Sequence, residues 1–91
     1  MPHPDRTQIY AAIDRERTHQ NRKYGTPADR NLPILGYWQI ALRELLEASQ
    51  AIGEDNTPHA LAELLQAAAV IVACIEQHGL IERTDLPDDN K

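Results

Sequence analysis

Apolar and polar residues recur with helical periodicity near the start of the chain. One set at intervals of three to four residues consists of Ile9, Ile13, Glu16 and Gln20. This spacing predicts a helix from about Thr7 to Asn21 with these side chains on one face. Asp5 or Thr7 can cap its first turn, because a short oxygen-bearing side chain accepts hydrogen bonds from the free backbone N–H groups there.

A loop and a second helix follow. Residues 23–33 include two prolines and a glycine, which fix turns and interrupt helices, so we predict a loop. The second helix is predicted to begin between Ile34 and Tyr37 and to continue to Ile52. Gly53 is then expected to adopt the left-handed backbone conformation that ends many helices.

The third helix is marked by residues typical of helix ends. Thr57 is the predicted N-cap and Pro58 the first helical residue, where its missing N–H costs nothing. Gly79 is expected to end this helix. The short polar turn 53–56 predicts an antiparallel hairpin of the second and third helices. From Thr84 onward no apolar periodicity remains, and we expect the end of the chain to fray.

The predicted fold class is all-α with three main helices, because no segment combines alternating apolar residues with hairpin turns. We divide the chain into an N-terminal extension (1–6), one helical domain (7–80) and a flexible acidic tail (81–91). The run Ala67–Ile75 is apolar on every side of its helix, so it must be covered from several directions. Two short helices cannot cover it. We therefore predict a homodimer, or a dimer of dimers, that completes a four-helix-bundle core.

Acidic side chains interrupt the apolar faces of the two hairpin helices. The second helix has one apolar seam made of Trp38, Ala41, Leu42, Leu45 and Ile52. Its other apolar face, which includes Tyr37, Ile40, Ala48 and Ala51, also carries Glu44 and Glu47. On the third helix, Glu63 and Gln66 lie beside Ala67, Val70 and Cys74. Glutamates are rarely buried without a partner, so these placements call for an explanation.

A divalent cation would explain them. In an antiparallel hairpin the two polar pairs can converge, and close carboxylates repel by about 4 kcal/mol per pair at an effective dielectric near 20. Oxygen ligands suit Mg²⁺ or Mn²⁺. One pair of glutamates three residues apart is usually a solvated face, whereas two pairs on consecutive helices favour a metal site. Its predicted ligands are Glu44, Glu47, Glu63 and Gln66.

Composition narrows the possible partners. The formal charge is −5, and no basic cluster exceeds the pair Arg22-Lys23, so we expect no nucleic-acid partner.

The single cysteine, Cys74, lies in an apolar run and is expected to be a buried structural thiol. The histidines have no zinc-ligand spacing. Without a signal-like start, a cytoplasmic location is expected. The longest apolar run has nine residues, against about 20 for a membrane-spanning helix, so we expect no membrane span.

Two helical segments and one upstream segment carry a family resemblance. Arg43-Glu-Leu-Leu-Glu47 and Glu63-Leu-Leu-Gln66 resemble the Glu-Glu-x-x-Glu and Glu-x-x-Asp motifs of MazG-like nucleotide pyrophosphohydrolases. The segment 16–25 resembles the Glu-Arg-x-x-Gln-x-x-Lys-Trp-Gly stretch of short phage-type members, and 66–76 resembles their apolar helix ending. The resemblance covers roughly 9–79. It departs from the family at Arg43 and Gln66, so three of the five acids in these two motifs remain: Glu44, Glu47 and Glu63.

The resemblance implies Mg²⁺-dependent hydrolysis of a nucleoside triphosphate to a monophosphate and pyrophosphate. It implies that Glu44, Glu47 and Glu63 are the catalytic metal ligands and that Lys23 or Arg43 neutralises the triphosphate. Candidates for stacking on the base are Tyr24, Tyr37 and Trp38, with core packing the favoured role for each of them. The departures leave two alternatives open: a catalytically inactive dimer acting as a binding or regulatory module, and an unrelated helical-hairpin interaction protein.

Overall fold

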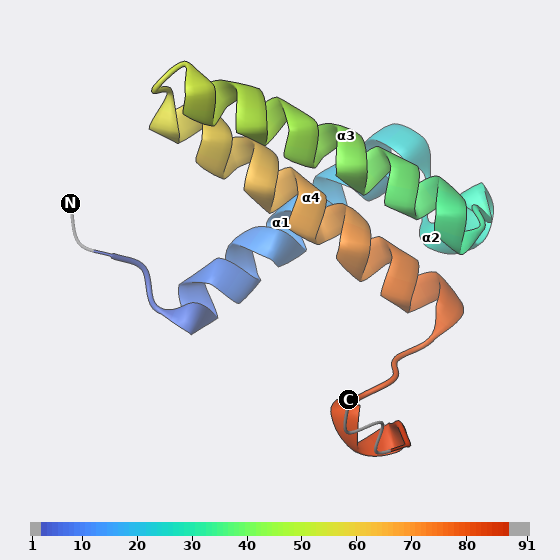
Figure 1. Ribbon diagram of the computed structural model, residues 1–91. Helices are drawn as coiled ribbons and strands as arrows, with labels where there is room; N and C mark the ends of the chain where they lie inside the picture. The colour runs from blue at the N-terminus through green and yellow to red at the C-terminus, as the bar shows by residue number, and fades with distance from the viewer. Residues whose placement is uncertain (1–2, 88–91) are drawn as a thin grey trace.

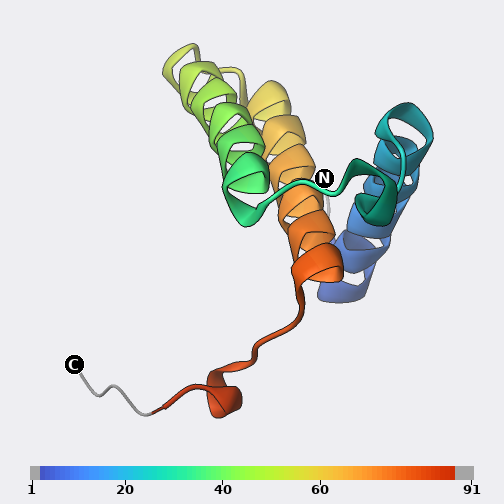
Figure 2. The same ribbon diagram turned by 90° about the vertical axis from the view of Figure 1, so that its right-hand side faces the viewer.

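Three long helices pack together in the computed structural model, which describes residues 3–87. The elements are α1 (Arg6–Tyr24), α2 (Pro27–Arg30), α3 (Ile34–Gly53), α4 (Thr57–His78) and the 3-10 helix η1 (Arg83–Asp85). Over the described range there is no strand. Helices α3 and α4 lie side by side and antiparallel (Figure 1). Helix α1 packs against α4 from the other side, so α4 is the central helix (Figure 2). The predicted all-α class with three main helices is confirmed.

Helix α1 begins directly after Asp5, one of the two predicted caps, and ends later than predicted. Asp5 is the N-cap, accepting a hydrogen bond from the backbone N–H of Gln8 at 2.9 Å. The Gln8 side chain accepts from the Asp5 N–H in return, which completes a capping box. The helix continues past Asn21 to Tyr24 and ends at Gly25, whose φ of 87° suits glycine.

The predicted loop 23–33 contains a short helix, so this part of the prediction was wrong. The Thr26 hydroxyl accepts a hydrogen bond from the N–H of Asp29, and the Asp29 carboxylate accepts one from the N–H of Thr26. These two bonds form a capping box at the start of α2. Pro27 occupies the first helical position, where proline favours a helix instead of breaking one. Asn31 ends α2 in the left-handed conformation.

The turn between α3 and α4 differs from the prediction at both ends. Gly53 is the last residue of α3, and the left-handed backbone position belongs to Asp55, with φ of 60°. Aspartate adopts this conformation more readily than most residues, which explains the shift. Asn56 caps α4 by accepting from the N–H of His59 at 3.2 Å, so Thr57 is the first helical residue and not the N-cap. The predicted end of α4 at Gly79 is confirmed.

Small side chains form most of the interface between α3 and α4. The buried residues there include Ala41, Ala48 and Ala51 from α3 and Ala60, Ala67 and Ala73 from α4. Alanine lets two helix backbones approach closely, which brings the residues on facing sides within reach of one another. Of the apolar seam predicted on α3, only Ala41 is buried within the chain. The face that carries Glu44 and Glu47 therefore packs toward α4.

The ends of the chain extend beyond this helical body. Arg6, assigned to the N-terminal extension, already belongs to α1, and the tail 81–91 contains η1. Residues 1–2 and 88–91 of the predicted extension and tail lie outside the described residues. The segment after α4 leads away from the three packed helices (Figures 1 and 2).

One segment, 57–85, is long and apolar enough to pass a length-and-composition test for crossing a membrane. It has 29 residues, and the mean hydropathy of its apolar window is 1.7. The longest uninterrupted apolar run is therefore too narrow a criterion to exclude a span. The central helix of a helical bundle meets the same test. Helix α4 packs against both α1 and α3 and carries the buried Glu63, which favours such a core helix.

Helix α1 is attached to α4 through polar contacts. Its two buried residues are Arg17 and Gln20. The Arg17 guanidinium donates to both carboxylate oxygens of Glu76 on α4, at 2.7 and 3.3 Å. It also donates to the side-chain oxygens of Gln20 and Asn21. The Arg17 side chain is 6% exposed and that of Glu76 47%, so the cation depends on this one carboxylate for its neutralisation.

Replacing Glu76 by Gln should lower the free energy of unfolding by about 2 kcal/mol. Removing one partner of a fully buried ion pair costs more, about 3–5 kcal/mol, and the half-exposed carboxylate reduces that value. Urea unfolding followed by circular dichroism measures the change. Glu54→Gln, at the exposed end of α3, is the matched control. Equal losses in the two variants would mean that Arg17 does not depend on Glu76.

Candidate metal centre

Three carboxylates from α3 and α4 converge in the structure. Glu44, Glu47 and Glu63 each place one carboxylate oxygen within 4.8 Å of the corresponding oxygens of the other two. Glu44 and Glu47 occupy successive turns of α3, and the antiparallel hairpin brings Glu63 of α4 opposite them. The acids predicted to face one another therefore do so.

Glu63 is the most deeply placed of the three. The residue is 6% exposed, and its Oε2 atom has no hydrogen-bond partner among the described residues. Its Oε1 atom lies 3.7 Å from Nε2 of His59, which neutralises it only when the imidazole is protonated. A buried carboxylate oxygen without a partner is costly, and a bound cation is one partner that would remove the cost. The donor set, made of carboxylate oxygens, fits Mg²⁺ or Mn²⁺.

The Glu47 carboxyl is harder to ionise than an ordinary glutamate. The pKa of Glu47 is raised above its ordinary value of 4.5, first because its carboxyl shares a hydrogen bond with the Glu63 carboxyl and then because the two charges repel. Arg43 and His59 partly oppose this rise. Without a cation Glu47 therefore keeps its proton to a higher pH than an ordinary glutamate does. A divalent cation bound there would displace this proton.

The raised pKa of Glu47 predicts a pH dependence of the metal-free protein. Below about pH 4.5 this carboxyl is protonated in both states, and its contribution to stability is fully present. As the pH rises through the raised folded-state pKa, that contribution is lost. In chelator, the melting temperature of Glu47→Gln should therefore be close to that of the wild type at pH 4.5. Toward pH 7 it should exceed the melting temperature of the wild type by a growing margin. A difference that does not change with pH would contradict the raised pKa of Glu47.

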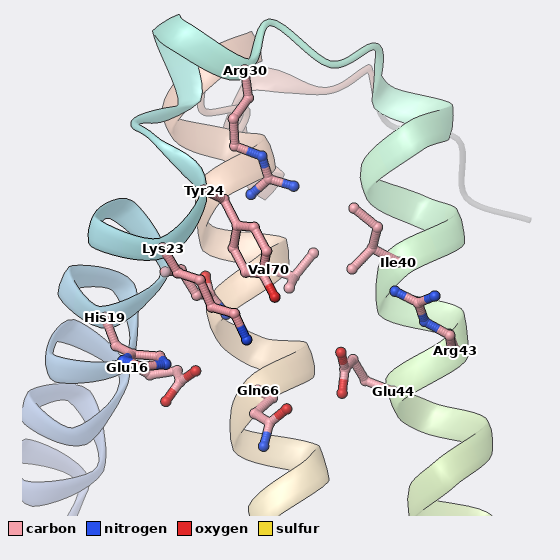
Figure 3. Close-up of a pocket in the computed structure, with 11 residues that line it drawn as sticks. Glu16, His19, Lys23, Tyr24, Arg30, Ile40, Arg43, Glu44, Gln66 and Val70 are labelled. Carbon is pink, nitrogen blue, oxygen red and sulfur yellow. The ribbon is translucent and has the colours of Figure 1, made fainter.

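A cavity of about 370 Å³ lies between α1 and α3 with α4 as its floor (Figure 3). Its lining includes Lys23, Tyr24, Arg43, Glu44 and Gln66. The three residues predicted to bind substrate therefore lie around one cavity together with two of the predicted metal ligands. Glu44 belongs both to this lining and to the carboxylate cluster, so it connects the two. Glu47 and Glu63 belong to the cluster alone.

Among the other lining residues, three with ionisable side chains were not predicted to be part of the site: Glu16, His19 and Arg30. Glu16, His19 and Lys23 recur on one face of α1 at intervals of three and four residues, and this periodicity could have identified them. No such signal exists for Arg30, because α2 has only four residues.

Tyr24 and Cys74 have surroundings that refine their predicted roles. The Tyr24 ring is 55% exposed, with Nζ of Lys23 5.2 Å and the Arg30 guanidinium carbon 5.5 Å from its centre. An exposed ring of this kind can offer a face to a planar ligand. Cys74 is half-buried and packs against the core around Tyr37. This position agrees with a structural thiol.

Comparisons with protein families, with curated proteins and with solved structures found no match to this chain.

Proposed function

We propose that this protein is a Mg²⁺-dependent nucleoside triphosphate pyrophosphohydrolase that releases a nucleoside monophosphate and pyrophosphate. The observation that carries the proposal is the buried, unpartnered oxygen of Glu63 within a cluster of three carboxylates. The adjoining cavity has cationic side chains suited to a phosphate chain. The resemblance of the two acidic helices to MazG-like pyrophosphohydrolases gives the reaction class.

Each residue has a defined part in the proposal. Glu44, Glu47 and Glu63 hold the cation, and Gln66 offers a neutral amide oxygen beside Glu44. A bound Mg²⁺ supplies a water of lowered pKa and polarises phosphate oxygens. Lys23 and Arg43 neutralise the triphosphate, which carries several negative charges into a partly enclosed space. Tyr24 lines the cavity beside Lys23 and Arg30 and is assigned to substrate binding.

The two departures from the family motifs bear on activity in different ways. Arg43 lines the cavity together with Lys23, so its charge is available to a phosphate chain. Gln66 also lines the cavity and is half-buried, where a neutral oxygen weakens the cation site without removing it. We therefore expect these two residues to lower the rate of hydrolysis without abolishing it. An inactive helical dimer that binds nucleotides without cleaving them is the second candidate.

A screen for pyrophosphate release tests the proposal. Nucleoside triphosphates and their deoxy forms are incubated with the protein in millimolar Mg²⁺, in Mn²⁺ and in chelator. We expect release with at least one nucleotide, dependent on the cation. The melting point should rise with the same cation, since a ligand at 100 times its Kd stabilises the folded state by about 2.7 kcal/mol. A raised melting point without any hydrolysis identifies the binding module, and neither response contradicts both candidates.

The exposed apolar face of the hairpin supports a homodimer as part of the proposal. A groove of about 300 Å³ between α3 and α4 is lined by Ile34, Tyr37, Trp38, Ala41, Leu45, Ile71, Cys74 and Ile75. Five of these residues are between 38% and 60% exposed: Ile34, Trp38, Leu45, Ile71 and Ile75. Two hairpins that bury this face against each other form a four-helix bundle. A dimer of dimers needs a second surface of the same chain.

The proposed setting is the cytoplasm, with no nucleic-acid or membrane partner. It rests on the net charge of −5, the lone half-buried thiol and the buried Glu63 on the central helix. An anionic protein repels nucleic acid at long range. The partner in this setting is a free nucleotide.

A further inference from the structure

The cavity beside the carboxylate cluster has two ends of opposite charge. Glu16 and Glu44 lie toward one end in Figure 3, and Arg30 lies at the other, with Lys23 and Arg43 between them. The acidic end adjoins Glu47 and Glu63 through Glu44. The basic end lies under α2, the short helix that links α1 to α3.

Arg30 is held in place by two aromatic rings. Its guanidinium carbon lies 5.5 Å from the ring centre of Tyr24 and 5.5 Å from that of Tyr37. Tyr37 is 1% exposed, and its hydroxyl donates to Oε1 of Gln77 at 2.5 Å. A guanidinium that packs on aromatic faces keeps its N–H donors at the edge, where they can bind an anion.

The segment that carries Arg30 is also fixed. Asn31 ends α2, and the next residue, Leu32, accepts hydrogen bonds at its carbonyl oxygen from Nε2 of Gln77 at 2.7 Å. Nε2 of His78 lies 2.8 Å from the same oxygen. Two contacts to the last turn of α4 thus anchor the chain beside Arg30. These contacts and the two rings restrict where the guanidinium can lie before a ligand arrives, which lowers the entropic cost of binding.

The three cations of the cavity have no acidic partner in the part of the chain that the structure describes. No carboxylate oxygen lies within 4.0 Å of a charged nitrogen of Lys23, Arg30 or Arg43, since the ion pairs there are Arg17–Glu76 and His59–Glu63. Three unpaired cations around a cavity favour a ligand with several negative charges. Guanidinium and phosphate match in charge and geometry, because two N–H groups can bind two phosphate oxygens.

We propose that Arg30 binds the terminal phosphate of the substrate and so selects triphosphates over shorter phosphate chains. The proposal rests on the proposed function for the orientation of the chain, with the bond to be cleaved near the carboxylates. A triphosphate placed this way reaches from the acidic end to Arg30. A shorter chain held at the carboxylates ends before it and binds only Lys23 and Arg43. Arg30 is then a specificity-determining residue, distinct from the groups that hold the cation.

Binding of inorganic tripolyphosphate and of pyrophosphate tests this role without any need for nucleotide hydrolysis. Isothermal titration in millimolar Mg²⁺ compares the wild type with Arg30→Gln and with Arg22→Gln. Arg22 is an exposed arginine that does not line the cavity, so its variant is the matched control for charge. The wild type should bind tripolyphosphate at least about 10-fold more tightly than pyrophosphate, the effect of one charge-assisted contact. Arg30→Gln should abolish this preference through weaker tripolyphosphate binding, and Arg22→Gln should keep it.

Two further variants keep the test decisive if Arg30→Gln melts too low to titrate. Arg30→Lys retains the charge and loses the planar fork, so it should reduce the preference for tripolyphosphate. Lys23→Gln, at an exposed position, should weaken both ligands and leave the preference intact. A wild type without preference, or an Arg30→Lys variant with the full preference, overturns the inference.

The results also separate this inference from the proposed function. If the protein cleaves nucleotides but its Arg30 variants keep the full preference for tripolyphosphate, the proposed function stands and the role of Arg30 is wrong. If the protein cleaves no nucleotide but prefers tripolyphosphate through Arg30, the phosphate site stands and the proposed function is wrong.

Discussion

Replacing Glu63 by Gln should stabilise the metal-free protein and abolish its response to Mg²⁺ and Mn²⁺. The Glu63 carboxylate is buried, its Oε2 atom has no partner among the described residues, and it opposes the charge of Glu47. Glutamine has nearly the same shape and no charge, so in chelator the free energy of unfolding should rise by about 1–2 kcal/mol. With cation present the order should reverse, because the wild type alone gains binding energy.

The same substitution should reduce pyrophosphate release by at least about 100-fold, the scale expected when one group that stabilises transition-state charge is lost. Melting curves in chelator and in millimolar Mg²⁺, with a pyrophosphate assay, measure both effects. Glu54→Gln removes one carboxylate outside the cluster and should change neither. If Glu63→Gln lowers the melting point in chelator and keeps the full cation response, Glu63 is a structural residue and the proposed metal centre fails.

Ile71→Asp should convert the proposed dimer into a folded monomer. Ile71 is 47% exposed in the single chain and lines the apolar groove between α3 and α4. In a dimer that buries this groove, the new carboxylate would lose its hydration without gaining a partner, which costs several kcal/mol. In the single chain it can reach water, so the helices should persist.

Light scattering at micromolar concentration measures the mass of the wild type, where two chains of 10.3 kDa are expected to associate. Ile9→Asp is the matched control, because Ile9 is 43% exposed on α1 and does not line the groove. This control should remain dimeric. A wild type that already scatters as one chain, with a cooperative melt, would remove the dimer from the proposal.

The hairpin and its acidic cluster could be predicted because they depend on local rules. Helical periodicity decides which side chains of α3 and α4 share a face, and a short turn forces these helices to be antiparallel. These two facts are enough to bring Glu44, Glu47 and Glu63 together. The cap at Asp5 and the end at Gly79 are equally local.

The rest depends on contacts between distant residues. The periodicity of α1 placed Ile9, Ile13, Glu16 and Gln20 on one face, yet Gln20 alone of these is buried, together with Arg17 from outside the set. Arg17 is buried because Glu76, far along the chain, neutralises it, and no local pattern announces that pairing. Arg30 escaped prediction for a related reason, since its position is fixed by rings from α1 and α3. Tertiary contacts overrode the local signal at both places.

The short turn of residues 54–56 between α3 and α4 has a consequence for the order of folding. Closing a short loop costs little chain entropy, so the hairpin can form first. Helix α1 docks later, because its contact with Glu76 joins residues that lie far apart in the sequence. The three carboxylates then meet in the first structured species, where their repulsion raises the barrier. A divalent cation bound at that stage screens the repulsion, and we expect refolding to be faster in Mg²⁺ than in chelator. The centre proposed for catalysis would thus also act as a nucleus of the fold.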